Sequence, residues 1–168
     1  MLTVPVRLIR SPASKGAFDM WLSGWTLVPS DEIQHVVTPN GADVEPWDHP
    51  SVKFSDGEVD GSDIIHLWSL LSSSSVANPL WDTILRDAPD GEEKIAVVRP
   101  AAIEAFAALT EDRISQLALA WQKAESSSGS LAWWKVDGIR NAIRELSFLA
   151  RQQLQLRNGY ELLMIWFR

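Results

Sequence analysis

The stretch from Asp137 to Arg168 constrains the fold more than any other part of the chain. Its first two thirds carry apolar residues at steps of three and four, which places them on one side of a helix. These residues are Ile139, Ile143, Leu146, Leu149, Ala150 and Leu154. Asn158-Gly159 then ends the helix, because glycine tolerates the left-handed conformation that helix ends favour. The pattern predicts a helix, a glycine stop and a terminal strand.

The terminal strand, Tyr160 to Phe167, is apolar on both faces. Its even-numbered residues from Leu162 would point to one side of a sheet and its odd-numbered residues from Leu163 to the other. Such a strand needs cover on both sides, so we expect it to lie in the middle of its sheet. The alternative is that one face is left bare for a partner.

Two other segments read as strands. Lys94 to Val98 is short and rich in β-branched residues, and Leu2 to Ile9 would be an edge strand because it contains Pro5. Phe18 to Val28 is apolar, with Trp21 and Trp25 four residues apart, so that both a helix and a strand stay open. We prefer a short helix or an irregular hydrophobic flap there.

Cap residues and apolar spacing predict further helices. One runs from Asp63 to Leu71 after Ser62, and another begins at Pro79 and carries Trp81 and Ile84. Two more follow Pro100 and Thr110, and a Ser/Gly linker covers residues 126–130. We therefore predict a single α+β domain over residues 1–168, with a small mixed sheet of about three strands packed by roughly four to six helices.

The composition changes between Asp43 and Asp63. This stretch holds seven acidic residues and one basic residue, Lys53, and its prolines and glycines disfavour regular structure. We interpret residues 43–61 as a long, acidic, exposed loop, of the kind that is usually either functional or disordered in a compact domain.

Charge and composition narrow the function. The net charge of −7 and the pI of about 4.9 argue against nucleic acid as the main partner, because phosphate binding needs a basic surface. The sequence has no run of eighteen apolar residues, no signal-peptide pattern and no cysteine. We therefore expect a cytoplasmic protein with no membrane partner and no disulfide.

The sequence shows no catalytic signature. Its three histidines, His35, His49 and His66, are not spaced as a helical metal pair, and the acids after Asp56 do not meet the EF-hand spacing. We predict no catalytic residue, no metal and no cofactor. An alternative is an enzyme or small-molecule-binding domain, with a pocket around Asp63, His66 and Trp68.

The order of elements over residues 62–167 resembles that of the YfbM-like bacterial domains, a family of unknown function. The matching residues are His66 to Leu71, Pro79-Leu80, Val97-Val98 with the helix from Pro100, and Leu146 to Trp166. The sequence departs from the family at Ile65, where an aromatic residue is expected, and in the serines that replace a glycine-rich segment. The resemblance implies an α+β domain and supplies no catalytic residue.

Small acidic proteins of this kind also resemble, in general character, the immunity proteins of bacterial toxin systems. Our preferred hypothesis is a binding protein that neutralises a basic toxin domain, with acidic side chains that steer the encounter and an aromatic anchor. The predicted partner-binding residues are Asp43, Glu45, Trp47, Asp48, Asp56, Glu58 and Asp60. A structural homodimer is a further hypothesis.

Overall fold

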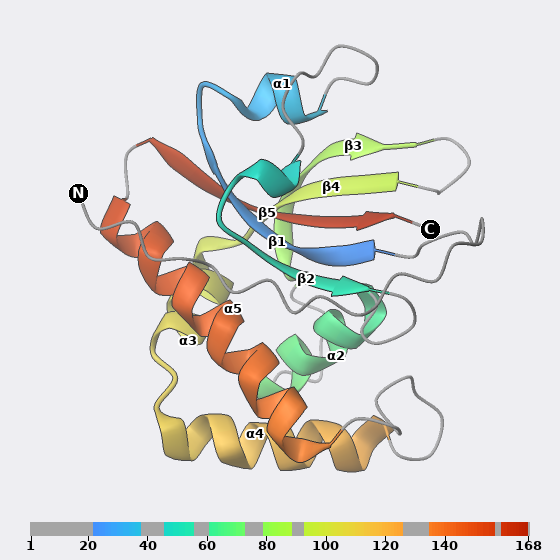
Figure 1. The fold of residues 1–168 in the computed structure, drawn as a ribbon, viewed down its shortest axis with the longest axis vertical. Helices are drawn as coiled ribbons and strands as arrows, with labels where there is room; N and C mark the ends of the chain where they lie inside the picture. The colour runs from blue at the N-terminus through green and yellow to red at the C-terminus, as the bar shows by residue number, and fades with distance from the viewer. Residues whose placement is uncertain are drawn as a thin grey trace.

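The computed structural model describes residues 22–37, 46–55, 61–72, 79–88, 93–125, 135–156 and 159–167, and these residues form an α+β structure, as predicted (Figure 1). Their helices are α1 (Ile33–Val37), the short 3-10 helix η1 (Pro46–Asp48), α2 (Gly61–Ser72), α3 (Pro100–Ala107), α4 (Glu111–Glu125) and α5 (Val136–Leu156). Their strands are β1 (Leu22–Pro29), β2 (Ser51–Ser55), β3 (Trp81–Asp87), β4 (Glu93–Val98) and β5 (Tyr160–Phe167).

The five strands form one sheet in the order β2-β1-β5-β4-β3, and each neighbouring pair is antiparallel. The prediction of a mixed sheet of about three strands is corrected: the sheet has five strands, and all of its neighbouring pairs are antiparallel. The strands expected at Lys94–Val98 and Tyr160–Phe167 are confirmed as β4 and β5, whereas Leu2–Ile9 lies outside the described residues. β2 and β3 were not expected as strands, and for β1 a strand was the alternative that was not preferred.

The terminal helix and strand are as predicted. α5 buries the side that carries Ile139, Ile143 and Leu146, and Gly159 separates it from β5 with a φ of +152°, which residues with a side chain rarely adopt. β5 lies between β1 and β4, so the expected central position is confirmed. Leu162 to Ile165 are all fully buried, because both faces of the strand are covered.

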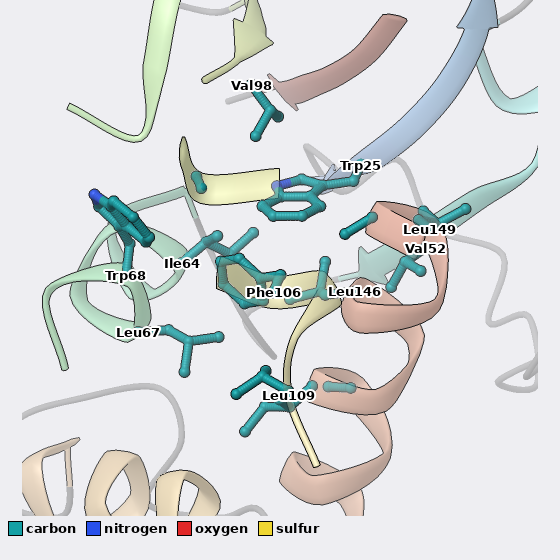
Figure 2. Close-up of a cluster of buried hydrophobic side chains, with 14 of the residues drawn as sticks. Trp25, Val52, Ile64, Leu67, Trp68, Val98, Phe106, Leu109, Leu146 and Leu149 are labelled. Atoms are coloured by element: carbon teal, nitrogen blue, oxygen red, sulfur yellow. The ribbon is translucent and has the colours of Figure 1, made fainter. Parts of the chain in front are cut away.

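The two faces of the sheet contribute to different cores. The main core lies between the sheet and α2, α3 and α5, and Figure 2 shows Trp25 of β1 above Phe106 of α3, with ring centroids 5.0 Å apart in an edge-to-face arrangement. α4 packs on α5 and α2 and lies farthest from the sheet in Figure 1. The second cluster, on the opposite face, joins Leu163 and Ile165 to Val36 of α1.

β1 replaces the helix or flap that was preferred over Phe18–Val28. Along this strand Trp25 and Leu27 enter the main core and Val28 enters the second cluster. Ser23 and Thr26 are buried too, so the strand has no polar face that would reveal it by alternation. A strand buried on both sides cannot be distinguished from a buried helix by periodicity alone.

β3 replaces the helix that was predicted from Pro79. Register shifts between Trp81 and Thr83 and between Ile84 and Arg86 interrupt its pairing with β4. Because the first shift adds a residue, Trp81 and Ile84 pair with Val98 and Ala96, which lie on one face of β4. Apolar residues three positions apart therefore share a side of this strand, which reproduces the spacing of a helix.

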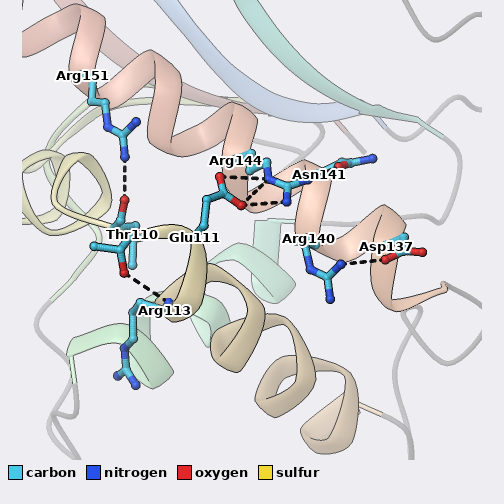
Figure 3. A network of polar contacts seen from close by, with 9 residues as sticks. Thr110, Glu111, Arg113, Asp137, Arg140, Asn141, Arg144 and Arg151 are labelled. Atoms are coloured by element: carbon cyan, nitrogen blue, oxygen red, sulfur yellow. Dashed lines mark hydrogen bonds and ion pairs between the residues drawn. The ribbon is translucent and has the colours of Figure 1, made fainter.

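Polar contacts join the helices α3, α4 and α5 (Figure 3). Arg144 of α5 donates to both carboxylate oxygens of Glu111 in α4, at 2.8 and 3.1 Å from its Nε. Arg151 donates to the main-chain oxygen of Ala107, the last residue of α3, whose carbonyl has no helical partner, and to that of Leu109 in the connection to α4. Thr110 Oγ1 accepts from the backbone N–H of Arg113 and so caps α4.

Replacement of Gly24 by alanine should destabilise the fold. A Cβ there would lie 2.0 Å from the carbonyl oxygen of Val52, so β1 and β2 would have to separate. We expect Gly24→Ala to lower the free energy of unfolding by about 3 kcal/mol or more, measured by urea denaturation. The matched control is Gly138→Ala in α5, where glycine is exposed and alanine should be neutral or stabilising. Equal stability of Gly24→Ala and the wild type would contradict this packing.

The pair Glu111–Arg144 should be visible in a titration. The hydrogen bond from Arg144 lowers the pKa of the Glu111 carboxyl below its ordinary value. The stabilisation from this pair is therefore present above the ordinary pKa and is lost as the pH falls through the lowered one. We expect Arg144→Gln to raise the pKa of Glu111 in a carboxyl-detected NMR titration. Arg113→Gln, which removes an arginine bonded to Gln116 instead, should leave it unchanged.

Candidate partner-binding surface

The predicted partner-binding residues fall on an acidic segment that is partly regular. Trp47 and Asp48 belong to η1, and Ser51–Ser55 form β2, so the prediction of an irregular loop over residues 43–61 is wrong for these positions. The strand follows from Val52 and Phe54, whose alternate side chains enter the main core. The remaining five predicted residues, Asp43, Glu45, Asp56, Glu58 and Asp60, lie outside the described residues.

Trp47 is a half-buried aromatic residue fixed to the sheet. Its ring packs against the second cluster, and Lys53 of β2 places Nζ 5.0 Å from the ring centroid. Lys53 can reach the ring because Val52 and Phe54 point into the main core, which directs Lys53 to the opposite face of the sheet. The residue that pairs with Lys53 on β1 is Gly24, which has no side chain to compete for that space.

Acidic side chains accompany Trp47. Asp48 is exposed, and His49 holds its Nε2 3.4 Å from the carboxylate of Glu32, in the turn that follows β1. The backbone N–H of Leu27 donates to the carbonyl of Pro50 at 2.9 Å, which ties the end of this segment to β1. The segment from η1 to β2 is thus held against the sheet by main-chain and side-chain contacts.

The net charge of the chain comes from one part of the sequence. Residues 31–63 contain nine acidic residues and one lysine, a net of −8, and the whole chain carries −7, so the other residues sum to +1. Sequence reasoning identified the acidic stretch between Asp43 and Asp63 but did not count Asp31 and Glu32 with it. Only the fold shows that Glu32 lies beside His49.

The residues of the alternative pocket, Asp63, His66 and Trp68, all lie on α2 and differ in burial. Trp68 is buried in the main core, where its ring stacks on Phe106 with centroids 6.4 Å apart. His66 is half-buried, and residues two apart on a helix project from different sides. Asp63 is buried in the first turn of α2.

The three histidines lie on separate elements: His35 on α1, His49 after η1 and His66 on α2. Within the described ranges, no three His, Asp or Glu side chains gather closely enough to hold a metal ion. The same part of the chain contains no helix with the length and apolar character needed to cross a bilayer.

A pair of half-buried tryptophans, missed by sequence reasoning, lies where the main core meets solvent. The rings of Trp81 and Trp166 have centroids 5.5 Å apart, and Lys94 Nζ lies 5.5 Å from the centroid of Trp166. Asp87 holds that lysine at 3.2 Å, and Ile84 beside it on β3 is 45% exposed. The charge beside this pair is matched within the sheet, because Lys94 is paired with Asp87.

Comparison with known proteins gives no family. No protein-family model matches the sequence, and neither the curated proteins nor the solved structures yielded a match. The resemblance to YfbM-like domains therefore stays a hypothesis.

The different positions of Trp68 and His66 predict unequal effects on stability. Trp68→Ala should lower the free energy of unfolding by about 3–5 kcal/mol, because it removes a large ring from the main core. His66→Ala, on the same helix, should change it by roughly 1 kcal/mol or less. Urea denaturation of both variants checks this, and a larger loss for His66→Ala than for Trp68→Ala would contradict the assignment of Trp68 to the core.

Proposed function

We propose that this protein is an immunity- or antitoxin-like inhibitor that acts in the cytoplasm and neutralises a cognate bacterial toxin domain by direct protein–protein binding. The observation that carries the proposal is that one segment of the sequence, residues 31–63, has a net charge of −8 and contains Trp47, which packs on the second cluster. A basic protein surface is the complementary partner for such a region.

The two features of this region act on different steps of binding. Exposed acidic groups attract a basic partner over several ångströms and raise the association rate, an effect that salt screens. Trp47 then offers a large aromatic surface at the point of contact, and tryptophan is enriched among the residues that dominate binding energy. Because Trp47 already packs on the second cluster, less side-chain freedom is lost when a partner covers it.

Removal of charge from the acidic segment should slow association. We expect the triple variant Asp56→Asn, Glu58→Gln and Asp60→Asn to bind its cognate toxin domain, sought among the products of the neighbouring genes, with a roughly tenfold lower association rate and a weaker dependence on salt. Surface plasmon resonance at several salt concentrations measures both quantities.

The control is a triple variant with the same change in net charge on the helices: Glu104→Gln, Asp112→Asn and Glu145→Gln, all at exposed positions. Its association rate should stay close to that of the wild type. Equal rates for both triple variants would show that the location of the charge is irrelevant. A neighbouring toxin domain that does not bind the wild type at all would refute the proposed function.

A further inference from the structure

Lys53 occupies an unusual place in the charge distribution. It is the only basic residue among residues 31–63, and it lies over the only tryptophan of that segment. A cation at this distance from an aromatic ring is attracted by the electron-rich face of the ring. The free protein therefore already uses the outer side of Trp47 to bind a positive charge.

We infer that Lys53 stands in for a basic side chain of the partner, which displaces it from Trp47 on binding. This inference rests on the proposed function and names the chemistry that the site recognises: an arginine or lysine side chain presented by a protein. Arginine fits better than lysine, because its planar guanidinium is less strongly hydrated and stacks on aromatic faces.

The surroundings of Trp47 support this occupant. The ring of Trp47 packs against the second cluster and has Lys53 over it, so a ligand that displaces Lys53 would take the side of the ring that Lys53 now covers. Lys53 is exposed on a flexible four-carbon stem, so it can leave the ring without any movement of β2. Asp48 is the next residue in η1 and is exposed, so the segment carries a negative charge beside Trp47 in the sequence.

Displacement of Lys53 also gives a reason for a lysine in an otherwise acidic segment. While no partner is bound, the ammonium group covers the aromatic surface and offsets part of the local negative charge. A partner must then offer a cation that binds the ring at least as well, which selects against neutral and acidic surfaces.

An octa-arginine peptide provides a probe for this site. Its affinity would be measured by isothermal titration calorimetry at low and moderate salt, with the Trp47 indole N–H signal followed by NMR. Lys53→Gln should tighten binding about two- to fivefold, the range expected for loss of a competing cation–π contact. Lys53→Arg keeps the charge but holds the ring more firmly, so it should weaken binding.

A double-mutant cycle separates occupation of the ring from simple charge. The gain from Lys53→Gln should disappear in a Trp47→Leu background, because no ring is then left to vacate. Lys123→Gln, which removes an exposed lysine from α4, controls for the change in net charge. Thermal unfolding of each variant shows whether its fold is kept. If Trp47→Leu does not fold, Trp47→Phe, which keeps a ring in the second cluster, replaces it in the cycle.

The outcomes are distinct. Equal tightening by Lys53→Gln with and without the Trp47→Leu substitution would overturn the inference, since charge alone would explain it, and would leave the proposed electrostatic docking intact. Unchanged binding in Lys53→Arg, together with an unmoved Trp47 signal, would also overturn the inference and leave the proposed electrostatic docking intact. Failure of the wild type to bind the peptide even at low salt would overturn both the inference and the electrostatic basis of the proposed function.

Discussion

The burial of β5 on both faces is the constraint on which the rest of the structure depends. Four consecutive residues, Leu162 to Ile165, are inaccessible to solvent, so apolar groups must be supplied from both sides of the sheet. α3 and α5 contribute to the main core on one side, and α1 with Trp47 contributes to the second cluster on the other. The segment proposed to bind a partner is therefore also part of the cover that the central strand requires.

This arrangement gives a structural role to three of the six tryptophans in the part of the chain that the structure describes. Trp25, Trp68 and Trp121 are buried in the main core, and the indole nitrogens of Trp25 and Trp121 make no hydrogen bond among the residues that the structure describes. Leaving a buried donor without a partner costs about 1–3 kcal/mol, so these rings are tolerated for the apolar area they bury. An abundance of tryptophan is thus a weak sign of an interface, and the position of each ring decides its role.

The sequence was informative where one periodicity dominated. α5 has a clear apolar stripe, β5 is apolar on both faces from Leu162, and both were predicted with the glycine between them. A strand was not preferred for β1 because the strand buries Ser23 and Thr26 and so loses alternation. β3 was missed because register shifts give it the spacing of a helix. β2 was hidden by the prolines, glycines and acids around it, because only Val52 and Phe54 mark it as a strand.

The candidate surface was predictable in composition but not in geometry. The acidic segment and its tryptophan can be found by counting charges along the sequence, because the residues involved are close together in the chain. The contact of Lys53 with Trp47 requires a strand that the sequence did not reveal, and the approach of His49 to Glu32 joins residues from different elements. Such contacts depend on the register of β2 against β1, which Gly24 permits by leaving room for the Val52 carbonyl. A single glycine on the neighbouring strand therefore influences both the stability of the sheet and the position of the lysine over the ring.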